Sequence, residues 1–347
     1  MPKRLFTAAA AVLLLTGAQA VAATSSFTAI YSFGDSLSDA GNLYLLSSNP
    51  ANGIAQQPLA PYSAGRFSNG DVWTQDLANA LGLGPLNPSL SPLGGNDYAY
   101  GGATTGTTDI HTATFIDLPS QIGQFESAHP LGASPTALYT LWIGANDVFG
   151  ALQALQADAI DNSEADRVVG EAAQNEANAA SALALFGAKD LLVFDLPNLG
   201  LTPAYNTSSQ QGEASALAAL YNRDLTADLG SVAGLKIVMA DTYYNLGYVV
   251  DNPGQFGFTN ATDACWTGND TGGAGTLCGA TVAEQDQYLF WDDVHPTAAG
   301  HILLSSLALT ALGVSVPEPS TWALLALGFV GLGAVRTRKA RAAATAR

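Results

Sequence analysis

The sequence predicts one α/β domain with a three-layer α/β/α, flavodoxin-like architecture, in which helices cover both faces of a central parallel sheet. Three observations lead to this prediction. Short apolar runs typical of buried strands alternate with longer segments of helical pattern. The 347 residues are within reach of one large domain, and a hydrophobic content of 48% is enough for its core. No internal repeat interrupts the alternation.

The expected elements follow one another in this alternating order. Short apolar runs predict strands at residues 27–33, 98–100, 137–143, 191–194 and 235–239. Segments of helical pattern predict helices at residues 73–81, 164–186, 210–229 and 297–312. Because helices separate most of these strands, we expect the strands to run parallel.

The helix at residues 164–186 is rich in alanine and stops before Gly187. Ser163 and Asp166 have the spacing of a capping box at its start, and the alanines indicate close helix packing rather than a binding surface. Residues 47–66 and 243–286 are rich in Gly, Asn, Thr and Pro. We expect both segments to be long loops over the functional site, where they would shape the access of a substrate.

The chemistry begins with Ser36, which follows the first predicted strand in the tetrapeptide GDSL at residues 34–37. We expect a helix to begin here, so that the backbone N–H of Ser36 faces an oxyanion. A serine hydroxyl is a weak nucleophile and needs an adjacent base, and the pKa of histidine suits that task near neutral pH. The sequence therefore predicts a histidine partner for Ser36.

Of the four histidines, His295 has the surroundings that such a base requires. Asp292 precedes it by three residues and Pro296 follows it, so a tight turn would bring the carboxylate to the Nδ1 side of the ring. The Nε2 side would stay free for Ser36, which is the arrangement of a Ser-His-Asp triad in the chain order Ser, Asp, His. The Gly-x-Ser-x-Gly signature of the α/β-hydrolases is absent, which counts against that fold.

Acyl transfer also needs donors that stabilise an oxyanion, and two segments offer them. They are YAYGGAT at residues 98–104 and WIGAND at residues 142–147, each with a strand-like run that ends in residues suited to a loop. In open α/β folds such loops lie at the carboxyl edge of the sheet, where ligands bind. Gly102 would supply a backbone N–H and Asn146 a side-chain amide.

Each of these segments alone also has a purely structural interpretation. The alternatives are a turn or cap at residues 34–36, a flexible bend at 101–102, a helix cap at 146–147, and a cap at Asp292 on a helix that Pro296 begins. Their occurrence together and in order favours a functional site. The remaining histidines are expected to have no catalytic role: His111 and His129 as loop residues, and His301 as a packed or solvated helix residue.

The four segments, in this order, resemble the GDSL esterases of the SGNH hydrolase superfamily. The likeness spans roughly residues 27–312 and includes SDAGN at 38–42, GRFSNG at 65–70 and HPTAAGH at 295–301. The resemblance implies a covalent acyl-enzyme mechanism without a cofactor. It assigns Ser36 as nucleophile and first oxyanion donor, Gly102 and Asn146 as the other oxyanion donors, His295 as base, and Asp292 as the residue that orients the base.

At two positions the resemblance leaves a choice between adjacent residues of the same type. Gly101 and Gly102 are adjacent and only one is the donor; Gly102 is preferred because Ala103 and Thr104 follow it, as in the family. Asp293 is then a spectator beside Asp292.

Both ends of the chain carry targeting signals. Lys3 and Arg4, an apolar run at 8–15 and small residues up to 23 form the three parts of a secretory signal peptide, with cleavage expected after residue 20 or 23. Pro-Glu-Pro at 317–319, an apolar run at 322–335 and a basic tail resemble the PEP-CTERM sorting signal of Gram-negative bacteria, which an exosortase reads. The alternative is a terminal helix or weak anchor, because the run is shorter than the roughly 20 residues that span a bilayer.

We therefore expect a signal peptide at residues 1–23, a hydrolase domain at 24–313 and a sorting signal at 314–347 whose apolar helix anchors the chain transiently in a membrane. The protein would be exported from a Gram-negative bacterium to the cell surface or the extracellular matrix.

The part of the chain between the two signals is strongly acidic. Residues 24–316 hold five Lys and Arg against 28 Asp and Glu, a net charge of −23. Such a field repels nucleic acid and anionic membrane surfaces and favours neutral or cationic substrates, although solubility is the simplest explanation for it. The sequence has no phosphate-binding glycine loop and no basic patch with aromatic residues, so a nucleic-acid partner is not expected.

Cys265 and Cys278 are the only cysteines, and in a loop of an exported protein we expect them to form a disulfide. The bond would brace the segment that leads into Asp292 and His295. A zinc site needs about four ligands and has no obvious partners here, so no metal or other cofactor is expected.

The sequence as a whole predicts an exported serine esterase or lipase that hydrolyses carboxylic esters. Its substrate stays open among short-chain acyl esters, acyl groups on extracellular polysaccharide, and phospholipids. Two other functions also stay open: a phospholipase or acyltransferase of the same fold, and a non-catalytic surface or matrix protein that binds glycans.

Overall fold

Four parallel strands form the central sheet of the chain, for which a computed structural model describes residues 26–106 and 116–314. The strands are hydrogen-bonded in the order β1 (Ile30–Gly34), β2 (Leu138–Trp142), β3 (Asp190–Phe194) and β4 (Lys236–Ala240). Every residue of β2 is buried, as expected for a parallel strand whose two faces are both covered. The signal peptide, the sorting signal and His111 lie outside the described residues.

The predicted strand at residues 98–100 is an extended segment beside β1 rather than a regular strand. Ser32 and Asp97 form a parallel bridge, and the amides of Tyr98 and Tyr100 donate to the carbonyls of Ser32 (2.7 Å) and Gly34 (3.1 Å). The segment therefore extends the sheet next to β1, which gives the strand order of a flavodoxin-like fold.

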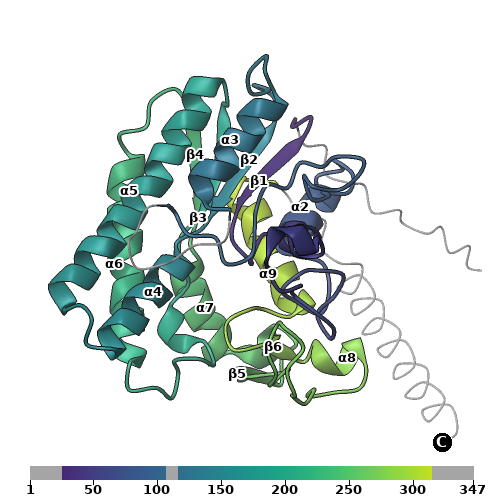
Figure 1. Cartoon of the computed structure of the whole chain (residues 1–347), viewed down its shortest axis with the longest axis vertical. Helices are drawn as coiled ribbons and strands as arrows, with labels where there is room; N and C mark the ends of the chain where they lie inside the picture. Colours follow the sequence, from purple (N-terminus) through teal and green to yellow (C-terminus); the bar gives the residue numbers. More distant parts are fainter. Residues whose placement is uncertain (1–25, 107–115, 315–347) are drawn as a thin grey trace, which may run out of the picture. The chain divides into compact units, whose positions relative to one another are not determined.

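Helices cover both faces of the sheet, as predicted (Figure 1). On one face lie α3 (Leu118–Ala128), α4 (Ala145–Gln156), α5 (Asn162–Phe186) and α6 (Gln211–Leu229). On the other face lie α2 (Trp73–Ala80) and α9 (Ala298–Ala311), where Trp73 packs against Trp142 and Phe194. The buried alanines of α5 pack in the core beside α6, in agreement with the expected close packing.

Two predictions, one about the start of α5 and one about the segment 243–286, are wrong. The N-cap of α5 is Asp161, whose side chain accepts a hydrogen bond from the Glu164 amide (2.9 Å), so the predicted capping box at Ser163 and Asp166 is wrong. The segment 243–286 is not one long loop, because it contains most of α7 (Thr242–Asp251), all of β5 (Asn260–Ala264) and α8 (Val282–Gln285). Asp241 caps α7 by accepting from the Tyr244 amide (3.0 Å).

Helices α3 and α4 were not predicted, and neither were the remaining elements, which are short. They are α1 (Asn42–Ser47), β6 (Tyr288–Phe290), which pairs with β5, and the 3-10 helices η1 (Pro50–Asn52), η2 (Leu199–Leu201) and η3 (Pro253–Gln255). Among the described residues, none of the helices combines the length and hydropathy of a membrane span.

Candidate active site

Ser36 follows β1 in a single turn, so the predicted helix at this position is wrong. The amide of Asp39 donates to the Asp35 carbonyl (3.0 Å), but α1 begins only at Asn42. The reason is local: the Asp39 carboxylate accepts from the amides of Gly41 (2.7 Å) and Asn42 (2.5 Å), and Gly41 takes a φ of 128°, which interrupts a helix.

Ser36, His295 and Asp292 form a continuous hydrogen-bonded chain. The Ser36 Oγ lies 2.7 Å from His295 Nε2, and His295 Nδ1 lies 2.9 and 2.8 Å from the two Asp292 carboxylate oxygens. The Asp292 Oδ1 also accepts from the amides of Val294 (3.0 Å) and His295 (2.8 Å). These two bonds form the tight turn that directs the carboxylate at the ring.

Neither of the two helix caps considered for these motifs is present. Helix α9 starts at Ala298 and is capped by Thr297, so Asp292 caps no helix and Pro296 begins none. Helix α4 follows Gly144, so neither Asn146 nor Asp147 is its N-cap. Gly144 has a φ of 108°, and a Cβ there would lie 2.4 Å from the ring of Tyr221, so the turn before α4 requires glycine.

Aromatic side chains enclose the pair of Asp292 and His295. The Tyr62 hydroxyl donates to Asp292 Oδ2 (2.6 Å), and the Phe67 ring lies 5.1 Å from the His295 ring between centroids. Tyr62, Phe67 and Trp291 belong to one buried cluster. The sequence block at residues 65–70 contains Phe67, but no local pattern points to Tyr62, because its partner Asp292 lies 230 positions further along the chain.

Opposing effects set the protonation of this pair. Burial tends to raise the pKa of Asp292, but the neighbouring His295 and hydrogen bonds from His295 and Tyr62 outweigh it and hold the pKa below its ordinary 3.8. Burial tends to lower the pKa of His295, but the Asp292 carboxylate outweighs it and raises the pKa above the ordinary 6.5. The pair thus favours a carboxylate beside a ring that readily accepts a proton.

Gly102 and Asn146 line the same cavity as Ser36. The Gly101 amide donates to Asp39 (2.8 Å), whereas within residues 26–106 and 116–314 the Gly102 amide has no hydrogen-bond acceptor. This difference favours Gly102 over Gly101 as a donor to a ligand. The Asn146 side-chain amide donates to the Ala103 carbonyl (2.8 Å), which uses one of its two N–H groups and leaves the second available.

The remaining histidines and Asp293 are separate from this arrangement. His129 ends α3 and packs against Tyr31, while His301 is fully buried in α9 and accepts from the Trp73 amide (3.2 Å). Burial lowers the pKa of His301 to about 3. Neither ring lines the cavity, and in the described part of the chain no hydrogen bond joins Asp293 to His295.

The predicted disulfide between Cys265 and Cys278 is present. The Cys265 amide donates to the Phe290 carbonyl (3.1 Å) and the Trp266 amide to the Trp291 carbonyl (2.6 Å). The bridged loop is therefore attached to the segment that leads into Asp292. Within the described residues, no cluster of three or more His, Cys, Asp or Glu side chains is arranged to hold a metal ion.

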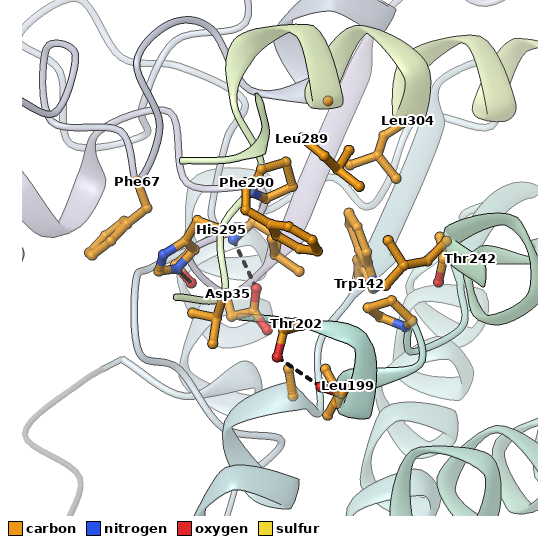
Figure 2. Close-up of a pocket in the computed structure, with 18 of the residues that line it drawn as sticks. Asp35, Phe67, Trp142, Leu199, Thr202, Thr242, Leu289, Phe290, His295 and Leu304 are labelled. Carbon is orange, nitrogen blue, oxygen red and sulfur yellow. Dashed lines mark hydrogen bonds between the residues drawn. The ribbon is translucent and has the colours of Figure 1, made fainter. Parts of the chain in front are cut away.

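The hydrogen-bonded chain opens into a cavity of about 630 Å³, a size usual for small-molecule sites. Figure 2 shows its lining extending from Phe67 and His295 past Phe290 to Trp142 and Leu304. The cavity therefore reaches well beyond Ser36.

Comparison with known proteins finds matches to two family models and several relatives. Residues 30–308 match the family model described as GDSL-like Lipase/Acylhydrolase, and residues 315–339 match the PEP-CTERM protein-sorting motif. The second match indicates export in a Gram-negative bacterium and processing by an exosortase.

The chain is 32% identical to an uncharacterized protein in the trpE-trpG intergenic region of Pseudomonas putida, over 87% of this chain and 51% of that protein. It is 27% identical to a phosphatidylcholine-sterol acyltransferase of Aeromonas hydrophila, over 89% of this chain and 96% of that protein. Identity to the esterase EstA of Pseudomonas aeruginosa is 30%, over 91% of this chain and 50% of that protein. The chain thus spans about half the length of the two Pseudomonas relatives.

Among solved structures, an acetylxylan esterase from Geobacillus stearothermophilus aligns with a TM-score of 0.42 and 13% identity, over 86% of this chain and 100% of that one. The family model, by contrast, covers most of the chain in a single match. The chain therefore belongs to the GDSL-like lipase/acylhydrolase family of carboxylic ester hydrolases.

Proposed function

We propose that the protein is an exported serine esterase that hydrolyses carboxylic esters through a covalent acyl-enzyme on Ser36. The observation that carries this proposal is the hydrogen-bonded chain from Ser36 Oγ to His295 Nε2 (2.7 Å) and from His295 Nδ1 to Asp292 (2.8 Å). A serine hydroxyl gains a base, and the base gains a carboxylate that sets its tautomer and stabilises its charged form.

In the first half of the proposed reaction, His295 Nε2 takes the proton of Ser36 as Oγ attacks the ester carbonyl carbon. The negative charge on the carbonyl oxygen is stabilised by the amides of Ser36 and Gly102 and by the Asn146 side chain. His295 then gives its proton to the leaving alcohol oxygen as the ester C–O bond breaks. In the second half, water replaces the alcohol, His295 takes a proton from it, and the acid leaves as the proton returns to Ser36 Oγ.

The test is the hydrolysis of nitrophenyl acetate by the full chain and by the variants Ser36→Ala and His295→Ala. We expect each variant to lose at least about a thousandfold in kcat/KM, because members of a triad act as a unit. Ser127→Ala, on α3, and His129→Ala, at the C-cap of α3, are matched controls away from the cavity and should keep the activity.

Equal rates for the parent and Ser36→Ala would refute the acyl-enzyme. If neither hydrolyses nitrophenyl esters, polysaccharide acetyl esters or phospholipids, the non-catalytic glycan-binding alternative would replace the esterase.

Acyl transfer is the second candidate, since an acyltransferase is among the relatives that align over nearly their whole length. The chemistry up to the acyl-enzyme is the same, and an alcohol then takes the place of water. Quantifying the ester product against free acid at increasing concentrations of an added alcohol separates the two reactions.

We also propose the domain boundaries and the destination. Residues 1–23 act as a signal peptide, 24–313 as the hydrolase domain and 314–347 as a sorting signal that anchors the protein transiently in the membrane before release to the cell surface or matrix. The masses of both ends of the protein recovered outside the cell test this proposal. Recovery of an intact chain that begins at residue 1 and ends at residue 347 would contradict it.

A further inference from the structure

The cavity continues from Ser36 into the space between α7 and α9, and we name this part the apolar arm. Its walls are formed by the ends of the strands and by one side of each helix. The lining residues used below are Trp142, Leu246, Val249, Leu303, Leu304 and Leu307. Figure 2 shows Trp142 and Leu304 facing this space on the side away from Phe67.

The arm offers apolar contact but few polar partners. The charged lining residues Asp35, Asp270 and His295 belong to the end of the cavity near the triad. The polar side chains of the arm donate within the protein: Thr242 to Asp195 (2.8 Å), Asn245 to the Asp241 carbonyl (2.5 Å), Ser306 to the Ile302 carbonyl (2.9 Å) and Thr310 to the Ser306 carbonyl (2.8 Å). A sugar would find its hydroxyl groups poorly matched here, whereas a hydrocarbon needs no such partners.

The end of the cavity away from the apolar arm is polar. Gln57 and Asp270 line it, and their loops are joined by the hydrogen bond from the Leu59 amide to the Asp270 carbonyl (2.7 Å). The cavity therefore has a polar end and an apolar arm, with Ser36 and His295 between them. An ester with a polar alcohol part and a hydrocarbon acyl part matches this division.

The length of the arm separates a long acyl chain from an acetyl group. Its lining positions on α9 run from Gly300 to Thr310, which corresponds to about 15 Å along a helix that rises about 1.5 Å per residue. An acetyl group would leave most of this apolar surface in contact with water. Leu303, Leu304 and Leu307 are only partly buried, so their surface is available to a ligand.

We propose that the apolar arm binds the acyl chain of long-chain carboxylic esters, with α7 and α9 as its walls and the polar end receiving the alcohol part. The inference rests on the proposed esterase function and names its substrate class. Each methylene buried in the arm strengthens binding by up to roughly fourfold, so kcat/KM should rise along a series of acyl chains until the arm is filled.

The experiment compares the full chain on nitrophenyl acetate, butyrate, octanoate and laurate with two variants that fill the arm. Val249→Trp and Ser306→Trp enlarge lining residues on α7 and α9. The Ser306 hydroxyl donates to the Ile302 carbonyl within its own helix, and in the described part of the chain it has no other hydrogen bond. Tyr248→Trp and Ile302→Trp are the matched controls, since these residues are 53% and 55% exposed and do not line the cavity. We expect the parent and controls to prefer laurate over acetate at least tenfold, and the filled variants to lose that preference while keeping acetate hydrolysis.

If acetate is hydrolysed but kcat/KM does not rise for octanoate or laurate, the acyl-chain assignment is overturned while the proposed esterase function is retained. A preference for laurate that the filled variants retain would place the acyl chain elsewhere and also overturn it. Absence of hydrolysis for the whole series, together with no labelling of Ser36 by a fluorophosphonate, would refute the proposed esterase and the assignment with it.

Discussion

At the scale of single residues, Tyr62 connects an irregular loop to the carboxylate of the proposed triad. Its hydroxyl donates to Asp292 Oδ2 (2.6 Å), the oxygen that accepts no backbone amide of the turn. Tyr62 is 6% exposed, so water does not easily replace this bond. We regard Tyr62 as a positioning residue, since it acts through Asp292 and not on a substrate.

Tyr62→Phe should shift the pH dependence of the reaction. In the proposed mechanism neutral His295 is the active form, so kcat/KM should rise with pH through the pKa of His295, which already lies above its ordinary 6.5. Without the Tyr62 hydroxyl, more of the Asp292 charge acts on the ring, so the rising limb should move to higher pH. The lost hydrogen bond to a charged group should also lower the free energy of unfolding by about 1.5–3 kcal/mol.

The measurement is the pH profile of kcat/KM for both proteins. Tyr139→Phe is the control, because its buried hydroxyl donates to the Ser134 carbonyl (3.1 Å) far from the triad and should affect stability only. If the rising part of the pH profile of kcat/KM is unchanged in Tyr62→Phe, the role of Tyr62 is purely structural.

At the scale of elements, the disulfide and the small β5–β6 sheet hold the loop that carries Asp292 and His295. Cys265 is 1% exposed and packs in the same buried cluster as Tyr62 and Trp291. The bridged cysteines are 13 residues apart, and β5 pairs with β6 immediately before Asp292. The long-range contacts of this region thus keep the proposed base in place.

Replacing both cysteines by alanine should lower the free energy of unfolding by about 3 kcal/mol, the value for a closed loop of roughly this length. Activity should be lost at a lower temperature than in the parent, since the loop before Asp292 is freed. Chemical denaturation with and without a reducing agent measures the effect. The reductant should weaken the parent and leave the double variant unchanged; an equal response in both proteins would show that the disulfide contributes nothing.

At the scale of the whole molecule, the acidic chain also buries acidic side chains. Burial raises the pKa of Asp35 to about 7, Asp147 to about 7 and Glu176 to about 8. Glu176 is the clearest case: Tyr221 has one proton but contacts both Glu176 (2.5 Å) and the Ile143 carbonyl (3.1 Å). If Glu176 is protonated it donates to Tyr221, which then donates to Ile143, so both contacts are hydrogen bonds.

These shifts predict that stability falls as pH rises. The unfolded chain loses the Glu176 proton near pH 4.5, whereas the folded chain keeps it up to about 8. Between these values each pH unit costs up to about 1.4 kcal/mol from this group. Glu176→Gln keeps a donor to Tyr221 and removes the titration, so it should stabilise the protein more at pH 8 than at pH 5. Urea denaturation at both pH values measures this, and an equal effect at the two would contradict the assignment.

Local patterns explain which elements were predictable. Strands β1 to β4 and helices α5, α6 and α9 have long apolar or alanine-rich patterns, and their predicted bounds lie within a few residues of the observed ones. Helix α7 was missed because its sequence lies in a stretch rich in Gly, Asn and Thr. Its N-cap Asp241 stabilises it locally, and it contacts β5 and η2 in the tertiary structure. The turn at Ser36 was mistaken for a helix because the Asp39 carboxylate accepts from the amides of Gly41 and Asn42, which interrupts the helix there.

The sequence by itself determined the α/β class, the family, the disulfide pair and the segments that contain Ser36, Gly102, Asn146, Asp292 and His295. The reason is that each of these can be recognised from a local sequence pattern. Their roles in catalysis stay predictions. Only the tertiary structure decided that Ser36 and His295, 259 residues apart, lie within 2.7 Å, that Tyr62 reaches Asp292, and that a cavity continues between α7 and α9. The physical reason is that these contacts join residues far apart in the chain, and packing of the sheet, rather than any local pattern, brings them together.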